Sequence, residues 1–193
     1  MSAEITHKQY HEYLLTRSRL GHLYRSYVLY PKVVRYLEGR TLDVGCGIGD
    51  LCLFRENTVG CDVNPYNVNH CKERGVKEAY LIEDGFPFPE KAFDSVLLDN
   101  VLEHLEEPSI VLDEVRRVLK DGGRFVVGVP GEKGYASDPD HKVFYDKEGL
   151  RALMKSYGFR EETTFCTPVD LKFLSKKLRQ YCLYGVYVKD DSI

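Results

Sequence analysis

The chain of 193 residues has no tryptophan and only two methionines, and its six cysteines include no C-x-x-C pair. Scattered cysteines argue against a disulfide framework and a zinc knuckle, so we predict that they are reduced and pack as small apolar residues. No apolar run approaches the length of a membrane span, and residues 1–10 lack the apolar core of a signal peptide. These absences predict a cytoplasmic protein without a membrane span.

Positive charge is not in excess either, because 27 basic residues stand against 30 acidic ones, for a net charge of −3. A chain without an overall basic field argues against nucleic acid as a partner. Hydrophobic residues make up 43% of the chain, which is enough for one core of ordinary size. We therefore predict a single domain over residues 1–193, as a monomer or homodimer.

The most informative stretch is residues 41–50, TLDVGCGIGD, where an apolar run ends in an acid and breaks into alternating glycines. This pattern predicts a strand that enters a tight turn. Gly45, Gly47 and Gly49 carry no Cβ, so the turn can take positive φ angles and a ligand can approach the main chain. The turn is therefore a candidate cofactor site.

The spacing of the glycines disfavours a dinucleotide cofactor. In the G-x-G-x-x-G fingerprint the third glycine falls one position later than Gly49, where this chain has Asp50. A carboxylate there would face a pyrophosphate, which is unfavourable. Asp43, directly before the turn, instead suits a ligand with a cationic end.

Acids also follow the next predicted strands. Residues 58–62 form a short strand that ends in Asp62, about 20 residues beyond Asp43, the separation expected in a βαβ unit whose second acid holds a ribose diol. A third strand leads into residues 83–85, Glu-Asp-Gly, and a fourth runs through residues 93–99 into Asn100.

Residues 43–49, DVGCGIG, resemble the D-x-G-x-G-x-G first motif of the class I S-adenosylmethionine-dependent methyltransferases, of the type 11-like group. The three later segments are similar to the family's next motifs in the same order, so the resemblance covers roughly residues 40–160. It implies a Rossmann-like, doubly wound α/β sheet of about seven mostly parallel strands, the last antiparallel, with helices on both faces. It also implies a helical cap over residues 1–38, a cofactor-binding core over 39–130, and a substrate loop with a C-terminal strand pair over 131–193.

The resemblance implies S-adenosyl-L-methionine as the cofactor, with the acid after the second strand on the ribose hydroxyls and the segment after the third strand on the adenine. The residues predicted to bind it are Asp43, Gly45, Cys46, Gly47, Asp62, Val63, Glu83, Asp84, Gly85, Asp99 and Asn100.

Two histidines are candidates for the base that takes a proton from the methyl acceptor. His104 follows the fourth predicted strand and His141 follows the fifth, and ligands of open α/β sheets bind at the carboxyl ends of such strands. Asp138, Asp140 and His141 would also suit magnesium. Loop acids are usually solvated, however, so we predict no metal.

The predicted activity is O-methylation of a small or medium acceptor such as a sugar or surface-polysaccharide precursor. The acceptor class rests on a loose resemblance of residues 131–145 and the tyrosine-rich tail to bacterial enzymes of that kind. A quinone C-methyltransferase, a tRNA-modifying methyltransferase of the same fold and a non-catalytic module that binds S-adenosylmethionine remain open. An NAD-dependent oxidoreductase is disfavoured by Asp50.

Local patterns give four further expectations. Residues 10–30 predict two amphipathic helices broken near Gly21 and Pro31, and residues 50–57 leave room for only a short crossover helix. Residues 132–142 predict a long polar loop, and lysines, an arginine and leucines over 171–179 predict a basic amphipathic helix.

Overall fold

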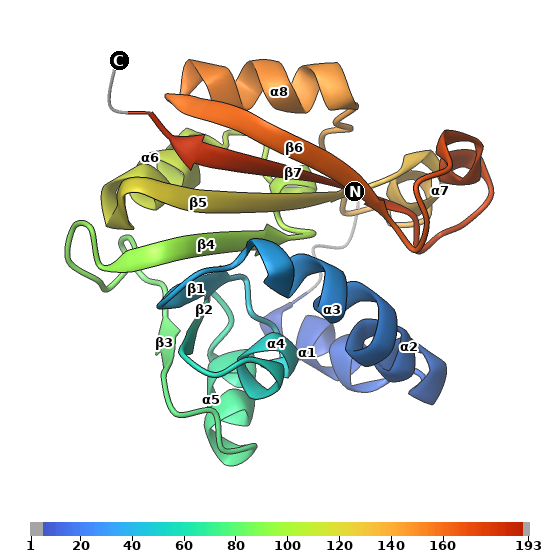
Figure 1. Cartoon of the computed structure of the whole chain (residues 1–193). Helices are drawn as coiled ribbons and strands as arrows, with labels where there is room; N and C mark the ends of the chain where they lie inside the picture. Colours follow the sequence, from blue (N-terminus) through green and yellow to red (C-terminus); the bar gives the residue numbers. More distant parts are fainter. Residues whose placement is uncertain (1–5, 191–193) are drawn as a thin grey trace.

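The computed structural model describes residues 6–190, apart from the side chain of residue 172. The ends of the predicted chain-wide domain, residues 1–5 and 191–193, lie outside this range. One seven-stranded sheet has the order β3-β2-β1-β4-β5-β7-β6 (Figure 1). Its strands are β1 (Thr41–Val44), β2 (Thr58–Asp62), β3 (Ala79–Leu81), β4 (Phe93–Asp99), β5 (Leu119–Pro130), β6 (Phe159–Thr167) and β7 (Cys182–Lys189).

The strand directions confirm the predicted topology. Neighbouring strands from β3 to β5 pair in parallel, and β7 lies antiparallel between β5 and β6. The order reverses direction between β1 and β4, which both leave the sheet at the same edge. In an open α/β sheet, this switch point is where ligands bind.

Side chains of β4 alternate between the two faces of the sheet. Val96 and Leu98 join the core beneath α6 (Ser109–Val118) and α8 (Lys147–Ser156), whereas Leu97 joins the core beneath the N-terminal helices and α4 (Asp50–Phe54). Figure 1 shows these two helical layers on opposite sides of the strands. Helices on both faces explain why the central strands are apolar at nearly every position.

The N-terminal segment is helical but is interrupted elsewhere than predicted. Its elements are α1 (His7–Leu15), α2 (Arg19–Tyr24), the π-helix η1 (Arg25–Leu29), α3 (Tyr30–Val33) and the 3-10 helix η2 (Val34–Tyr36). The predicted breaks at Gly21 and Pro31 are wrong, because both residues lie inside helices. The break comes before Ser18, whose hydroxyl caps α2 by accepting from Gly21 N, and Pro31 lies in the first turn of α3, where a missing N–H is tolerated.

The first crossover is as short as expected, since α4 has five residues. The second crossover is α5 (Pro65–Glu73), which Asn64 caps by accepting a hydrogen bond from Tyr66 N. Gly75 follows its end with a φ of 88°, a left-handed conformation that glycine adopts without strain.

Two later expectations need correction. The segment 132–142 is not a continuous loop, because α7 (Glu132–Ala136) occupies its first half. The basic stretch at 171–179 is not an amphipathic α-helix but contains the short 3-10 helix η4 (Lys172–Lys176). This stretch connects β6 to β7, whose ends are paired, and Ser175 Oγ accepts a hydrogen bond from Glu132 N. These two constraints hold the connection close to the sheet and to α7, which disfavours a longer helix.

All six cysteines are free thiols, as predicted. Within residues 6–190, no helix is both long and apolar enough to cross a lipid bilayer.

Candidate active site

The glycine turn after β1 has the conformation that its sequence predicts. Gly45, Gly47 and Gly49 have φ angles of 71°, 54° and 77°. A Cβ on Gly45 would lie 2.6 Å from Val101 Cγ2, and one on Gly49 would lie 2.8 Å from Cys71 Sγ. The turn therefore excludes side chains for two reasons, its backbone conformation and its packing.

Asp62, at the end of β2, is buried beside this turn. Its Oδ2 accepts hydrogen bonds from Gly47 N at 2.9 Å and from Asn67 Nδ2 at 3.2 Å, and its Oδ1 accepts one from Asn64 N at 2.8 Å. Burial raises the pKa of Asp62, while these hydrogen bonds oppose the rise. The carboxylate is thus fixed in orientation, and Oδ1, with one protein donor, can accept another hydrogen bond from a ligand.

Asp43, at the other side of the turn, is also buried, with 5% of its surface exposed. Burial, followed by the negative charge of Asp99, raises the pKa of Asp43 to about 8. The thiol of Cys52 contacts its Oδ2 at 4.0 Å. A cationic ligand group would favour the ionised form of this carboxylate.

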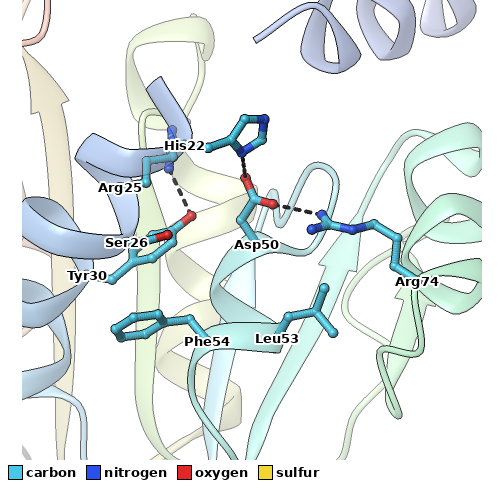
Figure 2. Close-up of a pocket in the computed structure, with 8 residues that line it drawn as sticks. All are labelled: His22, Arg25, Ser26, Tyr30, Asp50, Leu53, Phe54 and Arg74. Carbon is cyan, nitrogen blue, oxygen red and sulfur yellow. Dashed lines mark hydrogen bonds and ion pairs between the residues drawn. The ribbon is translucent and has the colours of Figure 1, made fainter. Parts of the chain in front are cut away.

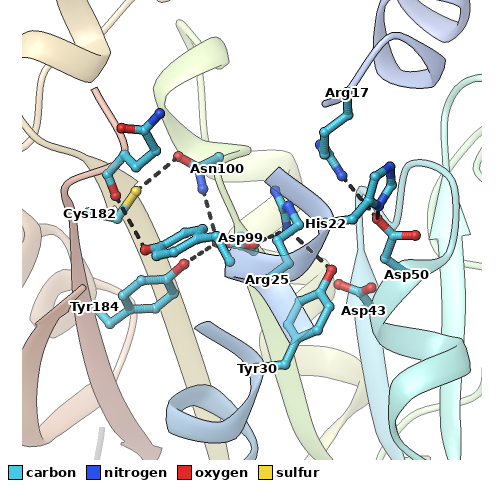
Figure 3. Close-up of polar contacts among 12 residues, drawn as sticks. Arg17, His22, Arg25, Tyr30, Asp43, Asp50, Asp99, Asn100, Cys182 and Tyr184 are labelled. Atoms are coloured by element: carbon cyan, nitrogen blue, oxygen red, sulfur yellow. Dashed lines mark hydrogen bonds and ion pairs between the residues drawn. The ribbon is translucent and has the colours of Figure 1, made fainter. Parts of the chain in front are cut away.

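Asp99, at the end of β4, is held by three side chains (Figure 3). Arg25 Nη1 donates to its Oδ2 at 3.2 Å, and Tyr184 Oη and Asn100 Nδ2 donate to its Oδ1 at 2.5 and 2.9 Å. Arg25 also donates to Tyr30 Oη. The N-terminal helical segment is therefore tied to the sheet by a charged hydrogen-bond network at the site.

Asp50 has a role that its sequence position did not reveal. It forms ion pairs with Arg17 at 3.0 Å and Arg74 at 2.7 Å, and His22 Nδ1 lies 3.7 Å away (Figures 2 and 3). Although burial acts to raise the pKa of Asp50, Arg74 and Arg17 hold it below its usual value. Asp50 thus joins α4 to α2 and α5 beside a small cavity of about 240 Å³.

The larger cavity, of about 710 Å³, lies over the carboxyl ends of β1, β2 and β4. Its size is within the range of about 300–1,000 Å³ that is typical of ligand sites. The N-terminal helices cover it, with Tyr10, Leu14 and Arg17 in its wall.

Most of the predicted cofactor residues line this cavity. They are Asp43, Gly45, Cys46, Gly47, Asp62, Val63, Asp99 and Asn100. Glu83 and Asp84 instead have exposed side chains, and the wall at this point is formed by Ile82 and Phe86. Contacts of residues 83–85 with the cofactor remain a prediction.

The two predicted catalytic histidines meet at the other end of the cavity. The rings of His104 and His141 are 4.7 Å apart and nearly perpendicular, at an interplanar angle of 63°. His104 Nδ1 lies 3.7 Å from Asp140 Oδ2, and His141 Nε2 lies 3.8 Å from Glu103 Oε1. Burial, then the neighbouring His141, lowers the pKa of His104, which favours a neutral ring.

Several residues at the site were not predicted. Arg17 and Arg25 were assigned only to amphipathic helices, and Glu103 was passed over although it precedes His104. Tyr184 lies in β7, and no role at the site was predicted for it. Two tyrosines of the N-terminal segment also belong to the site. Tyr10 lines the cavity, and Tyr30 lines it and is also buried in the core.

Comparison with known proteins agrees with this geometry. Residues 42–127 match the family model described as "Methyltransferase domain". The matched segment has the sequence motif and fold of the class I S-adenosylmethionine-dependent methyltransferase family. Methyltransferases of this family use S-adenosylmethionine as the methyl donor.

The chain is 32% identical over 122 residues to an uncharacterized protein of Methanocaldococcus jannaschii, covering 63% of this chain and 58% of that protein. It is 29% identical over 155 residues to a probable S-adenosylmethionine-dependent methyltransferase of Mycolicibacterium smegmatis, covering 72% and 60%. The chain thus spans about three fifths of the length of these relatives.

Among solved structures, a possible histamine N-methyltransferase of Thermotoga maritima superposes with a TM-score of 0.76 at 20% identity. The match covers 96% of this chain and 98% of the other. At this identity the similarity establishes the methyltransferase fold.

Proposed function

We propose that this chain catalyses methyl transfer from S-adenosylmethionine to an acceptor that enters the large cavity beside His104 and His141. The observation that carries the proposal is the contact between Gly47 N and Asp62 Oδ2, which joins the side-chain-free turn to a fixed carboxylate at the cavity wall. A nucleoside ligand needs both features, a backbone that it can approach closely and an acceptor for its ribose hydroxyls.

The wall residues suggest how the cofactor lies. Asp62 would accept hydrogen bonds from the ribose hydroxyls, while Ile82 and Phe86 would pack against the adenine base, with residues 83–85 at its edge. Asp43, buried beside Asp99, would face the cationic methionine end. When bound, the cofactor supplies an electrophilic methyl group on a sulfonium sulfur.

The polar end of the cavity suits an acceptor that loses a proton. Transfer forms a bond from the acceptor to the methyl carbon, breaks the carbon–sulfur bond and releases the acceptor's proton. His104 or His141, both in the cavity wall, would take this proton. An oxygen acceptor on a small or medium polyhydroxylated molecule, such as a sugar precursor, fits this end because Ser137 and Asp138 add further hydrogen-bonding groups.

The test has two stages. Calorimetric titration with S-adenosylhomocysteine should show one site, and labelled S-adenosylmethionine should then transfer its methyl group to a sugar-nucleotide, quinone or RNA fraction. Label in the quinone or RNA fraction alone would replace the sugar-type acceptor by one of those classes. Tight cofactor binding with no transfer to any fraction would instead support a non-catalytic binding module, and no binding would overturn the proposal.

A further inference from the structure

Three metal-binding side chains converge at the polar end of the cavity. Glu103 and His104 lie in the 3-10 helix η3 (Leu102–His104) after β4, and His141 lies in the segment after α7. One ligand atom from each residue lies within 4.8 Å of the other two. Elements after two neighbouring parallel strands therefore bring a carboxylate and two imidazoles to one point.

The carboxylate of Glu103 is buried and meets His141 Nε2 at 3.8 Å, beyond hydrogen-bonding distance. Its side chain is fully buried, and neither oxygen has a hydrogen-bond partner among residues 6–190. Burial raises the pKa of Glu103 to about 8, against a smaller opposing contribution from its own backbone amide. Buried carboxylates in proteins are normally paired, hydrogen-bonded or bound to a metal, so this one calls for a ligand.

The ring of His141 is oriented as in a metal ligand. Its Nδ1 lies 2.9 Å from the carbonyl oxygen of Tyr135, which can only accept, so Nδ1 carries the proton. The lone pair is then on Nε2, which faces Glu103 Oε1 across 3.8 Å. Metal-bound histidines commonly donate their second N–H to a carbonyl or carboxylate in this way.

The backbone fixes this arrangement. The carbonyl oxygen of Glu103 accepts hydrogen bonds from Lys142 N at 2.7 Å and Val143 N at 3.1 Å, which hold the segment of His141 against η3. Tyr135 also stacks on the His141 ring, with centroids 5.5 Å apart. The separation of the donor atoms is therefore set by the fold rather than by mobile side chains.

We propose that Glu103, His104 and His141 bind a divalent transition-metal ion whose remaining coordination positions face the cavity. Two donors bonded to one ion at about 2.1 Å lie about 3 to 4 Å apart, which accommodates the 3.8 Å between Glu103 Oε1 and His141 Nε2. Two imidazoles and one carboxylate suit Zn²⁺, Fe²⁺, Co²⁺ or Mn²⁺, whereas Mg²⁺ prefers oxygen ligands. A site centred on Glu103 would stand in place of the prediction of no metal, which was made from the loop acids.

The ion would face the acceptor side of the cavity, because His104, Ser137, Asp138 and His141 line it. In this step the inference rests on the proposed function. A metal-bound hydroxyl has a lowered pKa, so the acceptor could release its proton to water in the cavity at neutral pH, and the two histidines would serve as ligands in place of the base. The rival arrangement is a protonated Glu103 that donates to His141 Nε2, which needs no ion.

The test uses the full chain, stripped with a chelator and titrated with Co²⁺ in the absence of cofactor. We expect one equivalent to produce visible d–d absorption bands and a calorimetric heat, and Mg²⁺ not to compete. Glu103→Gln keeps the shape of the side chain. Glu103→Gln and His141→Ala should each weaken Co²⁺ binding at least about 100-fold, because losing even a partner that only orients a metal ligand costs about 10- to 100-fold. His70→Ala is the matched control, since His70 also faces a carboxylate, Glu73, at 3.9 Å but lies outside the cavity wall.

The outcomes separate the two proposals. Absence of Co²⁺ bands and heat at millimolar metal, or equal affinity in wild type, Glu103→Gln and His141→Ala, overturns the metal site and favours the protonated glutamate. If Glu103→Gln folds poorly, His104→Ala replaces it in the same comparison. Binding of S-adenosylhomocysteine is measured separately on the metal-free protein, so its failure would reject the cofactor site without bearing on the metal.

Discussion

Gly47 N donates a hydrogen bond to Asp62 Oδ2 over 2.9 Å, which joins the turn after β1 to the end of β2. Asn64 N and Asn67 Nδ2 complete the contacts of this carboxylate. One side chain therefore both shapes the turn and presents an acceptor to the cavity. Its loss should weaken ligand binding more than it lowers the stability of the fold.

We expect Asp62→Ala to weaken binding of S-adenosylhomocysteine about 10- to 100-fold, because charge-assisted hydrogen bonds contribute roughly 1.5–3 kcal/mol. Calorimetry measures the affinity. Asp94→Ala is the control, since Asp94 also accepts a backbone N–H, from Arg40 at 2.8 Å, but at the opposite end of the sheet. Equal losses of affinity in the two variants would contradict the assignment of Asp62.

The stability of the ligand-free protein should depend on Asp43. Because burial raises the pKa of Asp43 from 3.8 to about 8, the folded state binds this proton more tightly than the unfolded chain. The free energy of unfolding should therefore fall as pH rises from about 4 to about 8, and Asp43→Asn should flatten part of that slope by an amount on the order of a few kcal/mol. Burial also raises the pKa of Glu103, so its ionisation should add a slope of the same sign.

Urea unfolding at several pH values between 5 and 8.5 measures this slope. Asp113→Asn, on the exposed side of α6, is the control and should leave the slope unchanged. An unchanged slope in Asp43→Asn would show that Asp43 ionises in the folded protein as readily as in water.

Arg25 should be important for stability because it carries the positive charge beside Asp99. Arg25→Met leaves this carboxylate, 11% exposed, without its cation, and we expect a loss of about 3–5 kcal/mol in the free energy of unfolding. Arg151→Met is the control: Arg151 bonds Glu161 at 2.7 and 2.8 Å but is half exposed, so its loss should cost much less. Similar costs for both in chemical denaturation would contradict a structural role for the Arg25–Asp99 pair.

Gly49 and Gly75 form a matched pair that separates backbone strain from packing. Both have left-handed φ angles, 77° and 88°, but a Cβ on Gly49 would meet Cys71 and Val76 within 2.9 Å, whereas one on Gly75 would meet nothing within 4 Å. We expect Gly75→Ala to cost about 1–2 kcal/mol and Gly49→Ala about 1–3 kcal/mol more. Thermal or urea unfolding measures both, and equal costs would show that the turn yields to the added methyl group.

The parts of the fold that could be predicted are those whose chemistry is local. The turn at residues 45–49 needs glycine because of its own backbone, and Asp62 ends its own strand, so each is visible in a few neighbouring letters. Arg25 pairs with Asp99 across 74 positions, and only the docking of the N-terminal helices brings them together. No local pattern contains that contact.

Glu103 illustrates a second limit. It stands in the acidic stretch EHLEE, residues 103–107, and so polar a composition is typical of a solvated surface. Its burial arises because the backbone of residues 142 and 143 closes over η3. The loop acids Asp138 and Asp140 gave the stronger signal for a cation, although the buried acid has the more suitable surroundings.

The two asparagines that hold Asp62 also hold the first helix. Asn64 Nδ2 donates to the carbonyl oxygen of His7 at 2.7 Å, and Asn67 Oδ1 lies 2.9 Å from His11 Nδ1. We therefore expect a ligand bound at Asp62 to stabilise the covering helix, so that amide deuterium exchange along α1 slows when S-adenosylhomocysteine is added. Exchange in α1 would then report whether the cofactor site is occupied.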